Sequence, residues 1–182
     1  MPDLTTRLAA FLEVLGTGAS APTLTGVLST SVTAVGNVGT GEDDLITYSL
    51  PANSLASNGQ TLRVHAWGTL AGNANAKTLK FYLGSTTGFS TTLVPFATTT
   101  ALITGQWMLE ALIVRTGNST QSLVVRFTQL SGGTADIRDI VMDRNIVSAT
   151  ETDTAAITVK CTGQATNDND IVQSGMVVEG LL

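Results

Sequence analysis

Residues 48–69 read YSLPANSLASNGQTLRVHAWGT, a turn-rich loop that leads into a strictly alternating segment. In that segment Leu62, Val64 and Ala66 fall on one face. Successive side chains of a strand point to opposite faces, so the alternation predicts a half-buried β-strand over residues 61–67. The other face of this strand carries Arg63, His65 and Trp67.

The same alternation returns in TLKFYL, residues 78–83. Leu79, Phe81 and Leu83 share the inward face of this second predicted strand. We expect the two strands to pair through the connection GTLAGNANA, so that their outer faces form one aromatic and basic patch. The predicted patch consists of Arg63, His65, Trp67, Lys80 and Tyr82.

Such a patch has three interpretations: a solvated sheet face, a surface that docks on another copy or another protein, and a platform on which a sugar ring stacks. Tyr, Trp and Arg are enriched at protein interfaces, where they supply much of the binding energy. We therefore prefer docking and predict that the patch is a subunit interface.

The rest of the chain favours short strands separated by turn-forming clusters such as GNVGTGEDD, GSTTG and GQATNDND. Many short strands rich in Val, Ile and Thr predict an all-β fold. Their number favours an antiparallel β-sandwich of the jelly-roll type over an immunoglobulin-like domain. The predicted strands are 27–35, 45–50, 61–67, 78–83, 91–96, 107–115, 122–130, 135–142, 155–162 and 171–179.

The N-terminal residues differ from this pattern. Residues 3–15, DLTTRLAAFLEVL, have apolar side chains at helical spacing and an Asp that can cap the first turn. Gly16 ends the predicted helix, and the segment to Gly26 has a linker composition. We predict an arm over residues 1–26 and a β-sandwich domain over residues 27–182. The apolar stripe of the arm consists of Leu4, Leu8, Phe11, Leu12 and Leu15.

Charge is scarce, since Asp, Glu, Lys and Arg make up 13% of the chain, about half the usual share. The net charge of −5 argues against nucleic-acid binding, which needs a basic surface. Residues 107–115 are apolar on both faces, so their second face needs cover. The N-terminal helix, a long loop or a neighbouring subunit could supply that cover. We see no apolar run long enough for a membrane span and no secretory signal, and we expect a protein made in a cytoplasm.

Residues suited to catalysis do not converge in the sequence. The chain has one histidine, His65, and one cysteine, Cys161, which we expect to be a small buried core residue. The acidic clusters 42–44 and 168–170 lack the spacing of a calcium loop and are typical of turns that bond their own backbone. We predict no catalytic residue, no metal and no cofactor.

Two segments carry a resemblance: GTGEDD followed by YSLPANSLASNGQTLRVHAWGTLAGNANAKTLKFYLG, and the later TGQATNDNDIVQSGMVVEG. Together they resemble virion structural proteins of tailed bacteriophages, found as capsid decoration or head-fibre proteins and as fibre-tip domains. The similarity covers roughly residues 36–180 and leaves out the arm. It implies a jelly-roll sandwich that assembles as a homotrimer, and it brings no active site.

The leading hypothesis is therefore a non-enzymatic decoration or cement protein, a homotrimer that binds the major capsid protein and stabilises the virion shell. In this hypothesis Leu4, Leu8, Phe11 and Leu12 anchor the chain to the capsid. The alternative is a tail-fibre or head-fibre tip that binds host-surface glycans through loops such as 72–76 or 84–90. The short arm, in place of a long shaft, favours the first hypothesis.

Overall fold

The computed structural model describes residues 24–93, 96–97, 102–103, 105–131 and 141–181. Within these ranges the chain forms strands and connecting loops, and every strand pairing is antiparallel. The predicted all-β, antiparallel fold is confirmed. The predicted helix over residues 3–15, with Leu4, Leu8, Phe11 and Leu12, lies outside the described residues and stays a prediction.

The strands are β1 Thr25–Ser31, β2 Val35–Gly36, β3 Glu42–Leu50, β4 Thr61–Leu70, β5 Lys77–Leu83, β6 Thr86–Leu93, β7 Phe96–Ala97, β8 Leu102–Ile103, β9 Gly105–Gly117, β10 Thr120–Ser131, β11 Val141–Ala149, β12 Ile157–Gln164 and β13 Ile171–Leu181. The larger sheet has seven strands in the order β1-β13-β4-β9-β10-β11, with β2 also paired to β13. The smaller sheet has four, in the order β3-β12-β5-β6.

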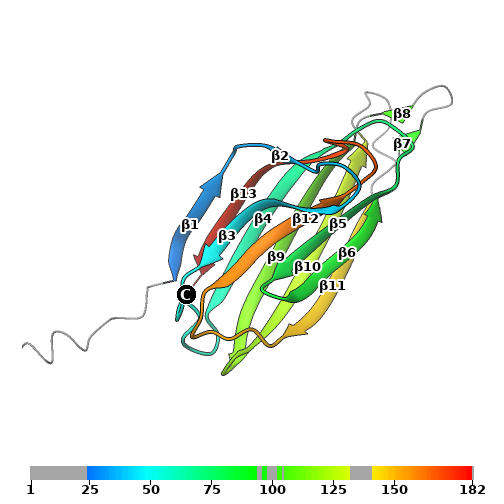
Figure 1. Cartoon of the computed structure of the whole chain (residues 1–182). Coiled ribbons are helices and arrows are strands. Elements are labelled where there is room, and N and C mark those ends of the chain that lie inside the picture. The colour runs from blue at the N-terminus through cyan, green and yellow to red at the C-terminus, as the bar shows by residue number, and fades with distance from the viewer. Residues whose placement is uncertain (1–23, 94–95, 98–101, 104, 132–140, 182) are drawn as a thin grey trace, which may run out of the picture.

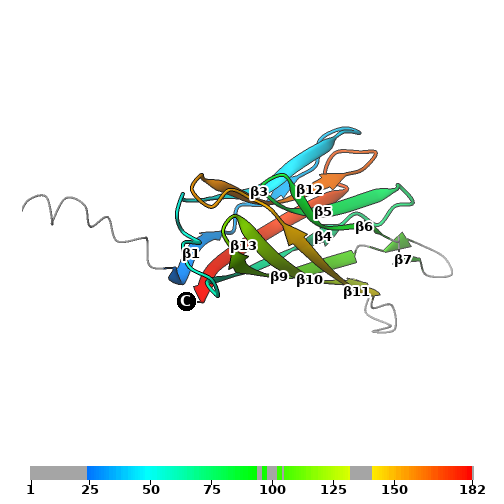
Figure 2. The ribbon, with the colours of Figure 1, turned by 90° about the horizontal axis from the view of Figure 1, so that it is seen from below.

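The two sheets stack as layers, as Figures 1 and 2 show from two directions. One hydrophobic core fills the space between them, with side chains from both inner faces. In β4 the buried and partly exposed residues alternate without a break, as the sequence pattern predicts. Phe89 of β6 and Phe127 of β10 stack across the layers with ring centroids 5.3 Å apart. This contact joins the two sheets at the β10–β11 side of the core.

The order of pairings is nested along the chain. The first strand pairs with the last, β1 with β13, and β3 pairs with β12 inside that pair. Next come β4 with β9 and, innermost, β5 with β6. Successive nested pairs alternate between the two sheets. The connection between β4 and β5 therefore crosses from the larger sheet to the smaller one.

Asp170, in the turn before β13, fixes this crossing. Its carboxylate is buried and accepts hydrogen bonds from Asn73 Nδ2 at 2.6 Å, Asn75 Nδ2 at 2.7 Å and the backbone N–H of Asn167 at 3.1 Å. The buried Lys77 ammonium donates to Asn73 Oδ1 at 2.6 Å. The asparagine-rich connection is thus a structured crossing between layers.

Two strand predictions were wrong in detail. The segment 27–35 is interrupted by a bend between β1 and β2, and β6 begins at Thr86, inside the cluster we expected to be a turn. Most of the strand expected over residues 135–142 lies outside the described residues and stays a prediction. The described strand β11 extends from Val141 to Ala149, beyond the predicted end at residue 142. Its sequence begins VMDRN, with polar residues on both faces, because β11 lies at the edge of its sheet and buries little on either side.

Candidate functional site

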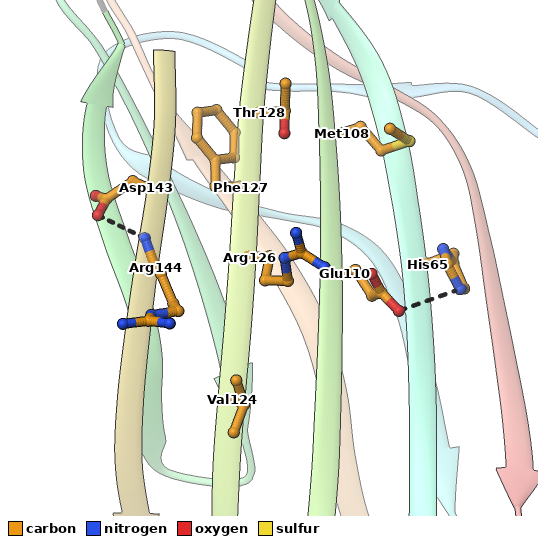
Figure 3. A pocket seen from close by; sticks show the side chains of 9 residues that line it. All are labelled: His65, Met108, Glu110, Val124, Arg126, Phe127, Thr128, Asp143 and Arg144. Atoms are coloured by element: carbon orange, nitrogen blue, oxygen red, sulfur yellow. Dashed lines mark hydrogen bonds and ion pairs between the residues drawn. The ribbon is translucent and has the colours of Figure 1, made fainter.

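A row of charged side chains crosses the outer face of the larger sheet. The strand register places His65 of β4 opposite Glu110 of β9, Glu110 opposite Arg126 of β10, and Arg126 opposite Arg144 of β11. Figure 3 shows these four side chains beside one another across four neighbouring strands. We call them the charged row.

An apolar row runs beside the charged row on the same face. The register places Leu112 opposite Val124 and Val124 opposite Ile146. Ile146 is 63% exposed, and Met108, on the other side of the charged row, is 50% exposed. These residues form the second apolar face that the sequence of β9 predicts, and the described part of the chain leaves it open to solvent.

The β10–β11 side of this face is hollowed, with a volume of about 660 Å³. The hollow is lined by all members of the charged row and by Met108, Val124, Phe127, Thr128 and Asp143. The lining combines charged side chains with the apolar Met108, Val124 and Phe127. The hollow is therefore suited to ion pairing and hydrogen bonding beside apolar contact.

Arg126 and Arg144 stand out within the hollow. They are directly opposite on adjacent strands, both exposed, and among the described residues neither guanidinium has an ion-pair partner. Like charges directly opposite each other destabilise a sheet. The other five described Lys and Arg side chains contact acids or buried polar groups: Arg63, Lys77, Lys80, Arg115 and Lys160.

The β4 residues of the predicted patch lie next to the hollow. Arg63 Nε is 3.8 Å from Glu110, Arg63 Nη1 is 3.8 Å from Glu179, and His65 Nε2 is 3.9 Å from Glu110. These distances are long for ion pairs and the side chains are 30–40% exposed, so each pair contributes little stability. Arg63 Nε is buried and has no hydrogen-bond partner.

Trp67 lies further along β4, over Gly175 in an irregular part of β13. A methyl group at Gly175 would overlap the indole ring, so only glycine leaves room for the ring in this position. A shallow pocket of about 350 Å³ opens beside the ring, with Gln106 and Ser174 among its lining residues. Trp67 is thus half-buried, with polar groups within reach of its open side.

The predicted patch is divided between two surfaces. Lys80 and Tyr82 lie on the outer face of the smaller sheet, because β5 pairs with β12 and β6 and not with β4. The expected pairing of the strands 61–67 and 78–83 is therefore wrong. The crossing between layers separates Lys80 and Tyr82 from Arg63, His65 and Trp67.

Charges on the outer face of the smaller sheet neutralise one another. Glu42 accepts hydrogen bonds from Lys80 Nζ at 2.5 Å, Thr162 Oγ1 at 2.7 Å and Tyr82 O–H at 3.0 Å. Burial acts to raise the pKa of Glu42, but these bonds outweigh it and hold the pKa below its ordinary value. The Nζ of Lys160 lies 2.6 Å from Oδ1 of the exposed Asp44 in β3 and also lies over the Tyr82 ring. Lys80 and Lys160 on this face are therefore each paired with a carboxylate of the same chain.

The residues considered for catalysis or metal binding have structural roles. Cys161 is fully buried, as expected, and burial raises the pKa of its thiol to about 12. Asp43 and Asp168 accept hydrogen bonds from the backbone of the loop at Val38 and Gly39. Within the described ranges no three His, Cys, Asp or Glu side chains gather as a metal site, and no helix there is long and apolar enough to span a membrane.

The two loops considered for glycan binding also use their polar groups internally. Asn73 and Asn75, in the connection 71–76, donate to Asp170. At the β5–β6 turn, Ser85 and Thr86 donate to Glu151 through backbone and hydroxyl groups. Fewer free donors remain in these loops than the sequence suggests.

The arginine pair was missed at the sequence level. A signal for Arg126 existed, because Val124, Arg126 and Thr128 alternate with the buried Leu123, Val125 and Phe127. Arg144 could not be placed, since the strand over 141–149 was not predicted.

No protein-family model matches the sequence, and no curated protein matches it. Among solved structures, the fold is similar to the CBM2 module of the evolved Dit of Lactobacillus casei BL23 phage J-1. The two are 12% identical with a TM-score of 0.39, over 85% of this chain and 95% of that chain. A likeness at this level says nothing about what the present chain binds.

Proposed function

We propose that this chain is a non-enzymatic structural protein of a tailed-bacteriophage virion that assembles as a homotrimer through the outer face of the larger sheet. The observation that carries the proposal is the uncovered apolar side chains on both sides of the charged row, with Ile146 63% and Met108 50% exposed. Exposed apolar surface beside charged groups is typical of protein interaction sites. The sequence resemblance to phage virion proteins supplies the biological setting.

The size of the face suits a protein partner. Six strands at a spacing of about 4.8 Å give a width of about 24 Å, and ten residues at about 3.4 Å each give a length of about 34 Å. The face thus offers about 800 Å², which is the contribution of each partner to a standard stable interface. A small ligand in the hollow would cover only part of it.

We infer that the layers form a jelly roll with an extension. The nested pairs β1·β13, β3·β12, β4·β9 and β5·β6 supply eight strands that alternate between two sheets, and eight strands in two sheets are typical of jelly rolls. β10 and β11 then widen the larger sheet beyond β9. This extension carries Arg126, Arg144 and the hollow.

The finer role we propose is that of a decoration or cement protein on the capsid shell. The apolar stripe of Leu4, Leu8, Phe11 and Leu12 would make the anchoring contact with the major capsid protein. The described chain begins at Leu24, directly before β1, the edge strand of the larger sheet that pairs with β13. An anchored trimer stabilises a shell because it binds only the assembled state.

Light scattering at micromolar concentration tests the assembly, with a trimer expected. A monomer would refute it, and a dimer would refute the trimeric form. For the anchor, we would remove residues 1–23 and measure occupancy on shells. We expect loss of binding with an unchanged melting temperature of the β-sandwich, and full occupancy would rule out the anchoring role. Imaging of particles would place the protein on the shell or on the tail.

A second candidate is a fibre tip that binds host glycans, which Trp67 favours. Its half-buried ring lies beside the amide of Gln106 and the hydroxyl of Ser174, groups that can stack on and hydrogen-bond to a sugar. A glycan array with the wild type and Trp67→Ala would test it. The candidate predicts binding that the substitution removes, and an array without binders would reject it.

A further inference from the structure

The charged row carries more positive charge than its own acids can neutralise. Glu110 lies between Arg63 and His65 on one side and Arg126 on the other, so three bases surround one carboxylate. A rotation of Arg126 toward Glu110 would still leave Arg144 without a partner. Asp143 also lines the hollow, but it accepts a hydrogen bond from the Arg144 backbone N–H and, among the described residues, forms no ion pair with either guanidinium. Both arginines at the β10–β11 side therefore lack a carboxylate partner within the described chain.

Apart from Glu110 and Asp143, the acid that this face offers to a neighbour lies at the opposite side. Glu179 of β13 is 30% exposed, and its ion pair with Arg63 Nη1 spans 3.8 Å. From β13 to β11 there are four strand spacings, about 19 Å. Glu179 cannot reach Arg144 of its own chain across that distance.

We propose that Arg126 and Arg144 bind Glu179 of a neighbouring copy of this chain. The outer face is acidic at its β13 side and basic at its β10–β11 side, so two copies are complementary when the faces overlap with an offset. Such a contact joins two different surfaces, and repeated contacts of this kind close into a ring of three when each copy is rotated by a third of a turn from the last. A carboxylate accepts paired hydrogen bonds from guanidinium groups, which suits it to the space between two arginines. This inference rests on the proposed assembly and adds its partner residue and its geometry.

The experiment is a double-mutant cycle on the dissociation constant of the assembly, measured by analytical ultracentrifugation at low salt. The variants are Arg126→Gln/Arg144→Gln, Glu179→Gln, and the combination of the three. Lys80→Gln/Lys160→Gln on the smaller sheet removes the same charge elsewhere and serves as the control. Circular dichroism melts check that each variant is folded.

Removal of one side of a desolvated ion pair is expected to weaken association by about thirty-fold or more. The combined variant should lose little beyond either single change, because both remove the same interaction. The lysine control should associate like the wild type. The proposal would be overturned if the losses of the arginine variant and of Glu179→Gln added up in the combined variant, or if the arginine variant associated like the wild type. Either result would leave the assembly itself in place.

A monomeric wild type would instead defeat the proposed assembly, so the two failures are distinguishable. An acidic saccharide is the other occupant that the arginine pair could suit. It would be recognised by glucuronate binding to the wild type that Arg126→Gln/Arg144→Gln abolishes, together with unchanged association, and that result would also overturn the proposal.

Discussion

The buried carboxylate of Asp170 offers a quantitative test of how the β4–β5 crossing is held. Asp170 and Lys77 are each 2% exposed. Asp170→Ala would leave the amides of Asn73 and Asn75 and the N–H of Asn167 without their acceptor, and would leave the Lys77 ammonium buried without its counter-charge. Lys77 makes no direct ion pair with Asp170, but each buried donor left without its charged acceptor costs about 1–3 kcal/mol, so a total of about 3–5 kcal/mol is expected.

For a domain of this size each kcal/mol lowers the melting temperature by about 2–4 °C, so a fall of about 6–20 °C is expected. Asp168→Ala, two residues earlier, is the matched control. Its carboxylate is exposed and accepts one bond, from the Gly39 N–H at 2.6 Å, so its loss should cost about 1 kcal/mol. Urea unfolding at fixed protein concentration measures both.

Addition of Lys77→Met to Asp170→Ala should recover part of the loss, since it removes the buried charge that has no partner. Equal costs for Asp170→Ala and Asp168→Ala would refute the reasoning, and so would a double variant no more stable than Asp170→Ala. Either result would mean that the polar cluster does not hold the crossing.

The same carboxylate predicts a pH dependence. Burial acts to raise the pKa of Asp170, but the bonds from Asn73, Asn75 and Asn167 and the charge of Lys77 outweigh it, and the pKa lies below its ordinary 3.8. The unfolded chain therefore binds this proton more readily than the folded one. The stabilisation is complete above about pH 4 and is lost as the pH falls through the lowered pKa. The stability gap between the wild type and Asp170→Asn should narrow over that range, and a constant gap would count against it.

Three further predictions follow from local contacts. Asp153→Ala should cost about 3 kcal/mol in urea unfolding, because the buried Asp153 accepts a hydrogen bond from Arg115 Nε at 2.8 Å; a cost below about 1 kcal/mol would contradict this. Cys161, with a thiol pKa of about 12, should not react with Ellman's reagent at pH 8 until the protein unfolds; reaction in the folded state would show that the core opens. Gly175→Ala should displace the Trp67 ring, cost about 1–3 kcal/mol and shift the tryptophan fluorescence, whereas Gly41→Ala, with open space around it, should do neither.

The sequence predicts local features well where burial is one-sided. The inward faces of β4, β5 and β12 were assigned correctly, including the buried Cys161. Where apolar and polar residues alternate strictly, only one orientation of the strand buries the apolar residues. The two apolar faces of β9 were also read correctly. Each of these inferences uses only neighbours within one strand.

What failed was the pairing between strands. Residues 61–67 and 78–83 are consecutive, alternate in phase and are joined by a short connection, so a hairpin was the simplest expectation. The crossing instead depends on Asp170, about a hundred residues later, which binds the asparagines of the connection. Long-range contacts of this kind leave no periodic signal, and the composition of the predicted patch could not show that it is divided between two surfaces.

The two outer faces then differ in a way that composition alone does not reveal. On the smaller sheet, the ammonium groups of Lys80 and Lys160 each lie 2.5–2.6 Å from a carboxylate oxygen, so these charges are already paired in the single chain. On the larger sheet, Arg126 faces Arg144, and the exposed side chain of Ile146 lies beside them. A face with two adjacent like charges and exposed apolar side chains is stabilised most by a partner that brings a carboxylate and buries the apolar surface. We therefore expect the larger sheet to face the inside of any assembly and the smaller sheet to form its exterior.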